Sequence, residues 1–448
     1  MGYGPAQRPS APRRVPPLVL LLTAIALVAG CATDPPEPRP YTPRAPADAA
    51  ARRTTLTVGV FGTFGMQEAG LYDAYMRLHP DIAIRQTSLT RNDVYYPQLL
   101  THLTAGSGLA DVQAVEVGNI AEVLETQGDR LVELGSAPGV DPSAFLPWKW
   151  AQGTAADGRT LALGTDIGPQ AVCYRRDLFA RAGLPTDRDE VGRLWAGDWR
   201  KYLAAGLSYR RRLPSGPAFT DSASGVLSAV TGSAALRYYD ERGRLIVAEN
   251  PAVREAWDLA ATFARQGLTA RLQQFTPGWD QAFANGAFAT VACPAWMLGY
   301  IRDKAGPAGR GLWDVAAAPR PGSWGGSFLV VPSAGRHRQE AAALAAWLTA
   351  PAQQAVLFAR RGSFPSAVAS YTLPTVADAR SPYFADAPVG RVFASAARGV
   401  PRAPVGPKDA LVSQTLSDVG MLQVDQTGRS PESAWNESMR AIDNALDR

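Results

Sequence analysis

Signals for β-strands and α-helices alternate along this chain from residue 56 onward. Short apolar runs predict strands at 56–61, 81–84 and 111–117, and apolar residues at helical spacing predict helices at 67–78 and 94–105. Parallel neighbouring strands require a long crossover, usually a helix, so this alternation predicts a parallel sheet covered by helices on both faces. The folded part of the chain is therefore expected to be an α/β protein.

The pattern changes after a further strand predicted at 160–163 and the loop 164–169. In the region that follows we predict helices at 191–205 and 252–265 and shorter strands at 170–174, 244–247, 288–293 and 314–318. A strand of the first region's type returns at 328–332, and the chain is predicted to be helical from about residue 339, with an interruption at 361–366. Two different structural units are expected.

The N-terminal 31 residues carry the pattern of a leader. Arg8, Arg13 and Arg14 precede an apolar run at 18–29, which is too short to span a bilayer as a permanent helix, so a signal peptide is predicted. Small residues end this run and Cys31 follows, which resembles the lipobox of bacterial lipoproteins. The resemblance implies that residues 1–31 are a lipoprotein signal peptide ending at Cys31, whose lipid anchors the protein to the outer face of the membrane. The alternative is an ordinary signal peptide that ends near a cysteine.

Composition restricts the class of partner. Residues 32–53 are rich in Pro, Ala and Thr and predict a flexible tether. The chain has 45 basic and 40 acidic residues, and without the three leader arginines the formal charge falls to +2, which argues against nucleic acid as a partner. The 448 residues allow two to three domains with large cores, and no second apolar run is long enough to cross a membrane.

Two cysteines remain once Cys31 is assigned to lipid. Cys173 and Cys293 form an even pair in an oxidising compartment, which predicts a disulfide, and such a bond requires the strands at 170–174 and 288–293 to be neighbours. The alternative is two buried free thiols.

Five motifs occur in a fixed order along the chain. They are Ala-Leu-Gly-Thr-Asp-Ile-Gly-Pro at 162–169, Cys-Tyr-Arg-Arg-Asp-Leu-Phe at 173–179, Phe-Ala-Asn-Gly-Ala-Phe at 283–288, Pro-Ala-Trp-Met at 294–297 and Trp-Gly-Gly-Ser at 324–327. With the lipobox, this set resembles the carbohydrate-specific extracellular solute-binding lipoproteins of ABC importers, family 1, and most of all the actinomycete cello-oligosaccharide binders. The similarity runs from about Leu56 to the C-terminus.

The resemblance implies an α/β, two-lobe, periplasmic-binding-protein-like fold with a ligand cleft between the lobes. We expect lobe I at 54–163 plus 328–372 and lobe II at 164–327 plus 373–448. The family captures an oligosaccharide, here cellobiose or a cello-oligosaccharide, by hinge closure and delivers it to the transmembrane subunits of an ABC permease. It performs no chemistry and needs no cofactor, and we expect a monomer on the extracellular face of the membrane.

A sugar site needs flat aromatic platforms and short polar side chains, because sugars present apolar C–H faces and many hydroxyls. Trp279, Trp296 and Trp324 lie at loop or element edges and are predicted to stack on sugar, with packing between domains or at the surface as the alternative. Trp257 and Trp347 lie in apolar helical patterns and are predicted to be core residues.

The polar candidates lie at strand ends and in loops. Glu116 ends a strand, where open α/β sheets place ligands, and is favoured over Asp111, which begins it. Asp166 is a ligand candidate at the first crossing between lobes, with a turn aspartate as the alternative. The other candidates share a place at a strand edge, beside a possible hinge, or in the family's third site segment: Phe64, Gln67, Gly325, Gly326, Ser327, Arg361, Ser363 and Phe364.

Catalytic and metal-binding motifs are scarce. The three histidines, His79, His102 and His337, form no close pair, which argues against a zinc hydrolase, and no metal is expected. There is no Gly-x-Ser-x-Gly elbow and no phosphate-binding Gly-x-x-x-x-Gly-Lys loop. A glycosidase needs only two carboxylates, however, so a secreted, lipid-anchored glycoside hydrolase is the alternative function. An orphan lipoprotein that signals or scaffolds is a third hypothesis.

Overall fold

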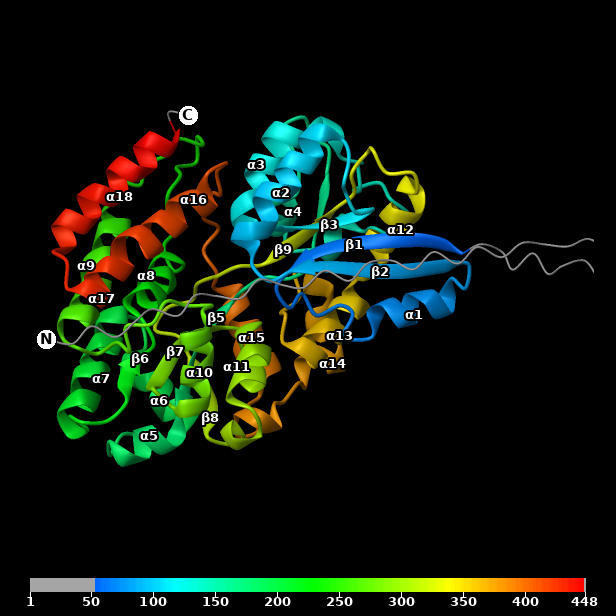
Figure 1. Ribbon diagram of the computed structural model, residues 1–448. Coiled ribbons are helices and arrows are strands. Elements are labelled where there is room, and N and C mark those ends of the chain that lie inside the picture. Colours follow the sequence, from blue (N-terminus) through cyan, green and yellow to red (C-terminus); the bar gives the residue numbers. More distant parts are fainter. Residues whose placement is uncertain (1–52, 447–448) are drawn as a thin grey trace, which may run out of the picture. The chain divides into compact units, whose positions relative to one another are not determined.

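The computed structural model describes residues 53–446, and two sheets organise them (Figure 1). The predicted signal peptide, the lipidation site Cys31 and nearly all of the tether lie outside the described residues. We call the elements built on the first sheet the first lobe and those built on the second sheet the second lobe.

The first sheet has five strands in the order β2-β1-β3-β9-β4. These are β1 (Thr54–Phe61), β2 (Ile82–Leu89), β3 (Val112–Glu116), β4 (Ala162–Gly164) and β9 (Ser327–Val330). β1 pairs in parallel with β2 and β3, as predicted, whereas β9 runs antiparallel to both β3 and β4. The prediction of an all-parallel sheet is therefore wrong, because β9 enters from the second lobe and runs against its neighbours.

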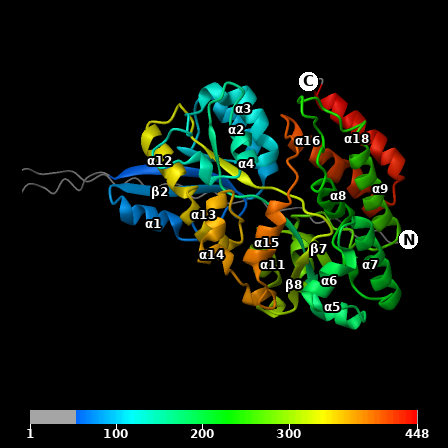
Figure 2. The same ribbon diagram turned by 180° about the vertical axis from the view of Figure 1, so that it is seen from behind.

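Helices cover both faces of the first sheet, as the alternation predicted. On one face Leu56, Val58 and Val60 of β1 pack against α1 (Leu71–Leu78) and α12 (Arg338–Leu348). On the other face Val115 and Phe328 pack against α2 (Asn92–Ala105) and α3 (Val117–Gln127). Figures 1 and 2 show α1 on one side of the strands and α2 and α3 on the other.

The second sheet has four strands in the order β6-β7-β5-β8. These are β5 (Gln170–Arg175), β6 (Ala218–Thr220), β7 (Phe288–Pro294) and β8 (Trp313–Ala317). β5 lies between β7 and β8 and runs antiparallel to both. The structure joins Cys173 of β5 to Cys293 of β7 in a disulfide, so the strand neighbours that such a bond requires are present.

Two predicted elements of the second lobe differ from the structure. The helix predicted at 191–205 is two helices, α6 (Arg188–Trp195) and α7 (Trp199–Arg212), because Gly197 takes a left-handed backbone and Asp198 caps α7 by accepting from the Arg200 N–H. The strand predicted at 244–247 is absent, and only an isolated bridge joins Tyr239 to Leu245.

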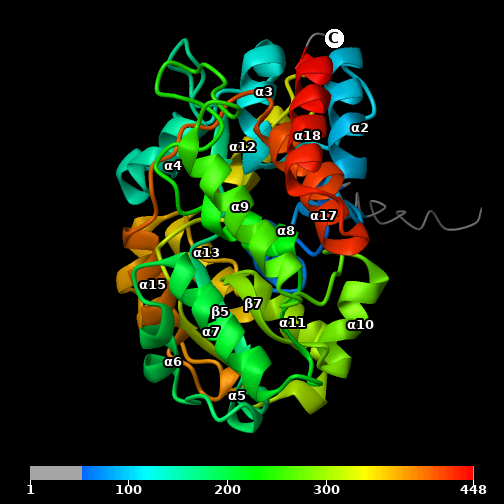
Figure 3. The same ribbon diagram turned by 90° about the vertical axis from the view of Figure 1, so that its left-hand side faces the viewer.

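The remaining helices complete the two lobes. The α-helices are α4 (Pro147–Gln152), α5 (Arg176–Arg181), α8 (Ala223–Thr231), α9 (Pro251–Arg265), α10 (Pro277–Asn285), α11 (Met297–Ala305), α13 (Pro351–Arg361), α14 (Pro374–Ala377), α15 (Val389–Arg398), α16 (Asp409–Gln414), α17 (Leu422–Thr427) and α18 (Pro431–Leu446). The shorter turns are η1 (Gly128–Arg130), η2 (Pro142–Ala144), η3 (Pro307–Gly309), η4 (Val368–Thr372) and η5 (Pro382–Phe384), and the π-helix is η6 (Thr415–Met421). Figure 3 shows α17 and α18 beside α8 and α9, where their apolar side chains share one core.

The segments that connect the two sheets lie side by side. Between β4 and β5, Ile167 donates its backbone N–H to the Phe364 carbonyl over 2.8 Å, and the Gly168 carbonyl accepts from the Trp324 N–H over 2.8 Å. These bonds join three segments. Residues 165–169 run from the first sheet to the second and are called the outward crossing, residues 318–326 run back to β9 and are called the return crossing, and the third segment follows α13. Within residues 53–446, no single helix is long and apolar enough to cross a membrane, although the bent pair α12 and α13 meets that criterion jointly.

Candidate ligand-binding site

Polar side chains gather where β3 and β9 meet the outward crossing. Glu116 pairs with Ser327 across the antiparallel ladder, and the Ser327 N–H donates to Asp166 Oδ1 over 2.9 Å. The Thr165 hydroxyl donates to the same oxygen over 2.7 Å. Burial raises the pKa of Asp166, and these two donors and Lys149 act against that rise. Three predicted site residues, Glu116, Asp166 and Ser327, therefore lie together.

Glu116 also begins a helix. Its Oε2 accepts from the Gly118 N–H over 2.6 Å, which caps α3. The pKa of Glu116 is raised to about 7, mainly by burial and also by the nearby Asp409 carboxylate, while the Gly118 N–H and the charge of Lys149 act against the rise. Asp111, the less favoured candidate, has a structural role, because it accepts from the backbone and hydroxyl of Thr57 and so joins β3 to β1.

Lys149 is a site residue that the sequence interpretation missed. Its side chain is 1% exposed, and its ammonium lies 3.6 Å from the centroid of the Phe328 ring. Burial lowers its pKa to about 8, and the carboxylates of Asp166 and Glu116 act against this. A signal was present, because lysine is rare in this chain and this one stands between Trp148 and Trp150. We call Glu116, Lys149, Asp166 and Ser327 the polar floor.

A group of aromatic side chains lies beside the crossing segments. Trp296 and Trp324 meet edge to face with centroids 5.3 Å apart, and the Trp296 indole donates to the Trp324 carbonyl over 3.0 Å. Both rings are partly exposed, as is Tyr300. Two of the three predicted platforms are thus adjacent and accessible.

Phe275 is the second residue that the sequence interpretation missed. The residue is 39% exposed, although its ring centroid lies 6.2 Å from that of Trp296 and 6.0 Å from those of Tyr300 and Trp324. Its φ of 61° is left-handed, which is an outlier for an aromatic residue and is typical of functional sites. No periodicity in the sequence indicates such a backbone. We call Phe275, Trp296, Tyr300 and Trp324 the aromatic wall.

Trp279 does not have the predicted role of a platform. It is fully buried in the first turn of α10, where its indole donates to Asp221 Oδ2 over 2.9 Å. The preceding Pro-Gly pair marks the start of a helix that packs inward, rather than an open loop edge. Trp257, in contrast, is buried in the core as predicted, and Trp347 is partly buried against Tyr75.

The remaining predicted residues divide between the site and its surroundings. Arg361 pairs with Asp303 over 3.0 Å, and its aliphatic part lies against Gly65 of the loop after β1. Phe364 is fully buried against Phe358 and Tyr371, so it offers no ring face to a ligand, contrary to the prediction. Ser363, in the same segment, is half-buried.

The loop after β1 carries two further candidates. Phe64 is half-buried and meets Phe61 edge to face at 5.7 Å, and Gln67 is exposed before α1. Across the crossing, Gly325 and Gly326 both have positive φ. A Cβ on Gly326 would lie 2.8 Å from the Asp166 carbonyl oxygen, so this glycine permits the close packing of the polar floor.

Comparison with known proteins identifies the family. The model of the bacterial extracellular solute-binding proteins matches residues 71–382. A crystal structure of an extracellular solute-binding protein of family 1 is 41% identical, with 88% of this chain and 99% of that chain covered and a TM-score of 0.76. The chain belongs to the bacterial extracellular solute-binding proteins. No curated protein sequence matches it.

More distant solute-binding proteins share the fold. The ABC transporter associated binding protein from B. animalis subsp. lactis Bl-04, in complex with β-1,6-galactobiose, is 20% identical, covers 87% of this chain and 97% of its own, and gives a TM-score of 0.72. The GacH receptor of Streptomyces glaucescens, solved unliganded and with acarbose, is 18% identical, covers 88% and 99%, and gives 0.70. The predicted two-lobe, periplasmic-binding-protein-like α/β fold is confirmed.

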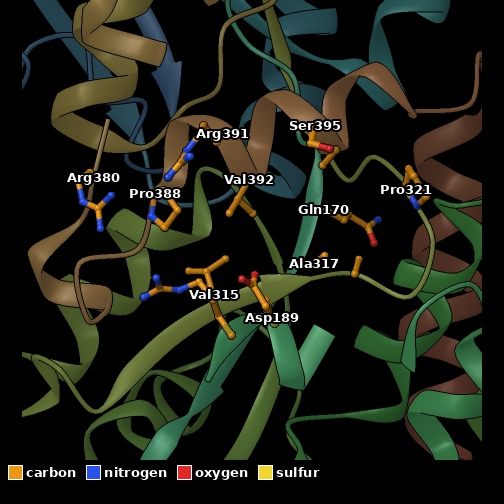
Figure 4. Close-up of a pocket in the computed structure, with 14 residues that line it drawn as sticks. Gln170, Asp189, Val315, Ala317, Pro321, Arg380, Pro388, Arg391, Val392 and Ser395 are labelled. Atoms are coloured by element: carbon orange, nitrogen blue, oxygen red, sulfur yellow. The ribbon is translucent and has the colours of Figure 1, made fainter. Parts of the chain in front are cut away.

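This extracellular solute-binding protein also contains a cavity that none of the predicted ligand residues lines. The cavity has a volume of about 530 Å³ and lies in the second lobe between α6, β8 and α15 (Figure 4). The sugar-site prediction stays with the aromatic wall and the polar floor, because the cavity contains no aromatic ring. Among residues 53–446, no three His, Cys, Asp or Glu side chains are placed to hold a metal ion.

Proposed function

We propose that this solute-binding protein is the sugar-capturing component of an ABC importer. It binds an oligosaccharide, cellobiose or a cello-oligosaccharide, by hinge closure and delivers it to a membrane permease. In this proposal the protein acts as a monomer, held on the extracellular face of the membrane by lipid on Cys31. The predicted signal peptide and the solute-binding family support an extracellular role.

The aromatic wall is the observation that carries the proposal. Phe275, Trp296 and Trp324 leave parts of their rings uncovered, although each has aromatic neighbours that could have buried it. Uncovered rings of this size fit the apolar C–H face of a pyranose. In the polar floor Glu116 is partly exposed, and its carboxylate can accept from sugar hydroxyls, whereas Lys149, Asp166 and Ser327 are buried around it.

Relatives with sugars bound support the same ligand class. The B. animalis protein was solved with β-1,6-galactobiose, the GacH receptor with acarbose, and T. maritima MalE3, which is 17% identical to this chain, with maltose. These ligands differ in linkage, so they favour an oligosaccharide without specifying which one. The cello-oligosaccharide assignment rests on the resemblance in the sequence motifs.

Calorimetry with cello-oligosaccharides tests the proposal. We expect saturable binding of one ligand per protein, with intact sugar recovered by chromatography afterwards. Shortened products would instead support the glycoside hydrolase alternative. A parallel screen of β-glucan, chitin, xylan and starch fragments identifies the preferred ligand, and failure of every oligosaccharide to bind would overturn the proposal.

A further inference from the structure

The cavity in the second lobe is a separate feature from the aromatic wall and the polar floor. Its base is β8, and its sides come from the start of α6 and from α15. Figure 4 shows Arg391 and Val392 on one side, facing Val315 and Asp189 on the other. Charged side chains thus line a hollow to which the proposed sugar function gives no role.

Arg188 is one of three arginines around the cavity, and it is fixed in place. Its Nε donates to Asp314 Oδ1 over 3.0 Å, and its Nη2 donates to Asp314 Oδ2 over 3.2 Å and to the Ala385 carbonyl over 2.8 Å. Asp314 is 2% exposed, so this contact is buried. A guanidinium has five N–H donors, and the Nη1 donors of Arg188 are not used in these bonds.

Arg380 is held at the surface, by the turn that also contacts Arg188. Its Nε donates to Asp386 Oδ2 and its Nη2 to the Asp386 carbonyl, both over 2.8 Å. Ala385 and Asp386 have left-handed φ values of 48° and 56°, a strained conformation for two consecutive residues that are not glycine. Strain of this kind is concentrated at ligand clamps, and here it positions acceptors that orient two arginines.

Arg391 is the arginine left free for a ligand. It is exposed in the first turn of α15 and lines the cavity, and within residues 53–446 no carboxylate pairs with it. Arginine forks bind carboxylate and phosphate oxygens in a bidentate manner, and orientation by neighbouring groups lowers the entropic cost of binding. The arginine side of the cavity therefore suits one anionic group.

The rest of the lining suits hydroxyls on a short carbon skeleton. Asp189 can accept from a hydroxyl, and Ser395 can donate or accept. Gln170 is 1% exposed, and neither atom of its amide has a partner, so turning the amide toward the cavity would break no hydrogen bond. Val315 and Val392 supply apolar surface between these groups.

We propose that this cavity is a second ligand site, which binds a small hydroxylated anion with its carboxylate or phosphate on Arg391, Arg188 and Arg380. Its hydroxyls contact Asp189 and Ser395. The site is separate from the sugar site, because no residue of the aromatic wall or the polar floor lines it.

Calorimetry at low and at physiological ionic strength tests the proposal with four probes: gluconate, glucose 6-phosphate, glucose and inorganic phosphate. We expect saturable binding of gluconate or glucose 6-phosphate, and the preferred probe tells whether the anionic group is a carboxylate or a phosphate. Arg391→Ala should weaken this binding at least tenfold, and Arg391→Lys should weaken it less. Arg310→Ala, at an exposed arginine of the same lobe outside the cavity, is the matched control and should bind like wild type.

Several results would overturn the proposal. These are binding of neither organic anion, wild-type binding by Arg391→Ala, and inorganic phosphate binding as tightly as glucose 6-phosphate, which would indicate an adventitious ion only. Loss of anion binding in Trp296→Ala would place the anion in the sugar site instead. Oligosaccharide affinity should be unchanged in Arg391→Ala, so this proposal and the sugar proposal can fail separately.

Discussion

Buried Lys149 and partly buried Glu116 place opposite charges close together where the chain crosses between its two sheets. The pKa of Lys149 is lowered to about 8 and that of Glu116 is raised to about 7. Burial is the main cause of both shifts, because it disfavours the charged form of each group. Because each pKa differs between the folded and the unfolded protein, the free energy of unfolding depends on pH.

This yields a prediction for stability against pH. The folded-state pKa of Glu116 is raised, so folded protein binds more protons than unfolded protein between about pH 4.5 and 7, and this group makes stability fall as pH rises through that window. Lys149 has a lowered pKa, so its contribution makes stability rise with pH between about 8 and 10.5. Glu116→Gln should keep the cap of α3 and make the first slope smaller, because it removes the contribution of Glu116 but leaves other buried carboxylates with raised pKa values, such as Asp166 and Asp409. Denaturant unfolding from pH 5 to pH 8 measures how the free energy of unfolding changes with pH. An equal slope in the variant and the wild type would contradict the raised pKa of Glu116.

The tryptophans give a second prediction at this scale. Trp296→Ala removes part of the exposed aromatic wall and should weaken oligosaccharide binding by about 2 kcal/mol, roughly thirtyfold, with a small change in melting temperature. Phe275→Ala should behave similarly. Trp257→Ala opens a cavity in the core and should lower the melting temperature strongly, at a cost of about 3–5 kcal/mol.

Trp279→Ala separates the two roles, because this ring is buried behind the wall. We expect it to lower stability first, and affinity only through the loop that carries Phe275. The link is Asp221, which accepts from both the Trp279 indole and the Gln274 amide next to Phe275.

If Trp296→Ala binds oligosaccharide like wild type while Trp257→Ala loses only binding, the division of these tryptophans into aromatic wall and core is wrong.

At the scale of elements, the crossing segments depend on close backbone contact. A Cβ on Gly168 would lie 1.8 Å from the Trp324 carbonyl oxygen, so Gly168→Ala must push the two crossings apart. We expect a loss of about 2 kcal/mol or more in stability. Gly278→Ala is the matched control, since its Cβ would meet nothing closer than 3.9 Å, and it should be nearly neutral. Thermal unfolding compares them, and equal melting temperatures would refute the argument.

Sequence patterns predicted some of the helices and strands well and missed others. Period-two and helical spacing located β1, α2 and α9 well, because each turns its apolar residues toward one buried face. A continuous apolar run located β5, which is buried on both faces. The same spacing missed the break between α6 and α7, since apolar residues continue through Gly197 and only the backbone of the glycine interrupts them. The antiparallel direction of β9 could not be read from β9 itself, because direction is set by where the chain enters the sheet.

Only the site residues that stand at recognisable places between helices and strands could be predicted from the sequence. Glu116, Asp166, Trp296 and Trp324 stand at strand ends and crossings, which the pattern of elements reveals. Phe275 depends on a left-handed backbone and Lys149 on distant carboxylates, and neither has a local pattern.

At the scale of the whole molecule, an ion pair joins the lobes away from the crossing segments. Lys408, just before α16, donates to Glu122 of α3, and the Tyr96 hydroxyl donates to the same carboxylate over 2.8 Å. The contact is close, since a Cβ on Gly118 would lie 3.2 Å from the Cβ of Ala410. Lobe rotation on ligand binding would have to keep or break this contact.

Charge reversal tests this contact. Glu122→Lys and Lys408→Glu each place two like charges opposite one another across the lobes. Each should therefore increase the radius of gyration of the ligand-free protein in small-angle scattering. The double exchange should restore the wild-type radius. A double variant no better than the singles would mean that the ion pair does not hold the lobes together. In wild type, an unchanged radius at saturating oligosaccharide would count against hinge closure.

The position of β9 in the first sheet has a consequence for biosynthesis. β9 fills the place between β3 and β4, yet it is made more than 200 residues after β3 and more than 160 after β4. At roughly 5–20 residues per second, both strands would wait on the order of ten seconds or longer with an open edge, and an open strand edge invites pairing with other chains. A nascent chain that folded as it left the ribosome would therefore expose a half-built sheet. Transport of the unfolded chain across the membrane before folding begins would let all five strands meet at once.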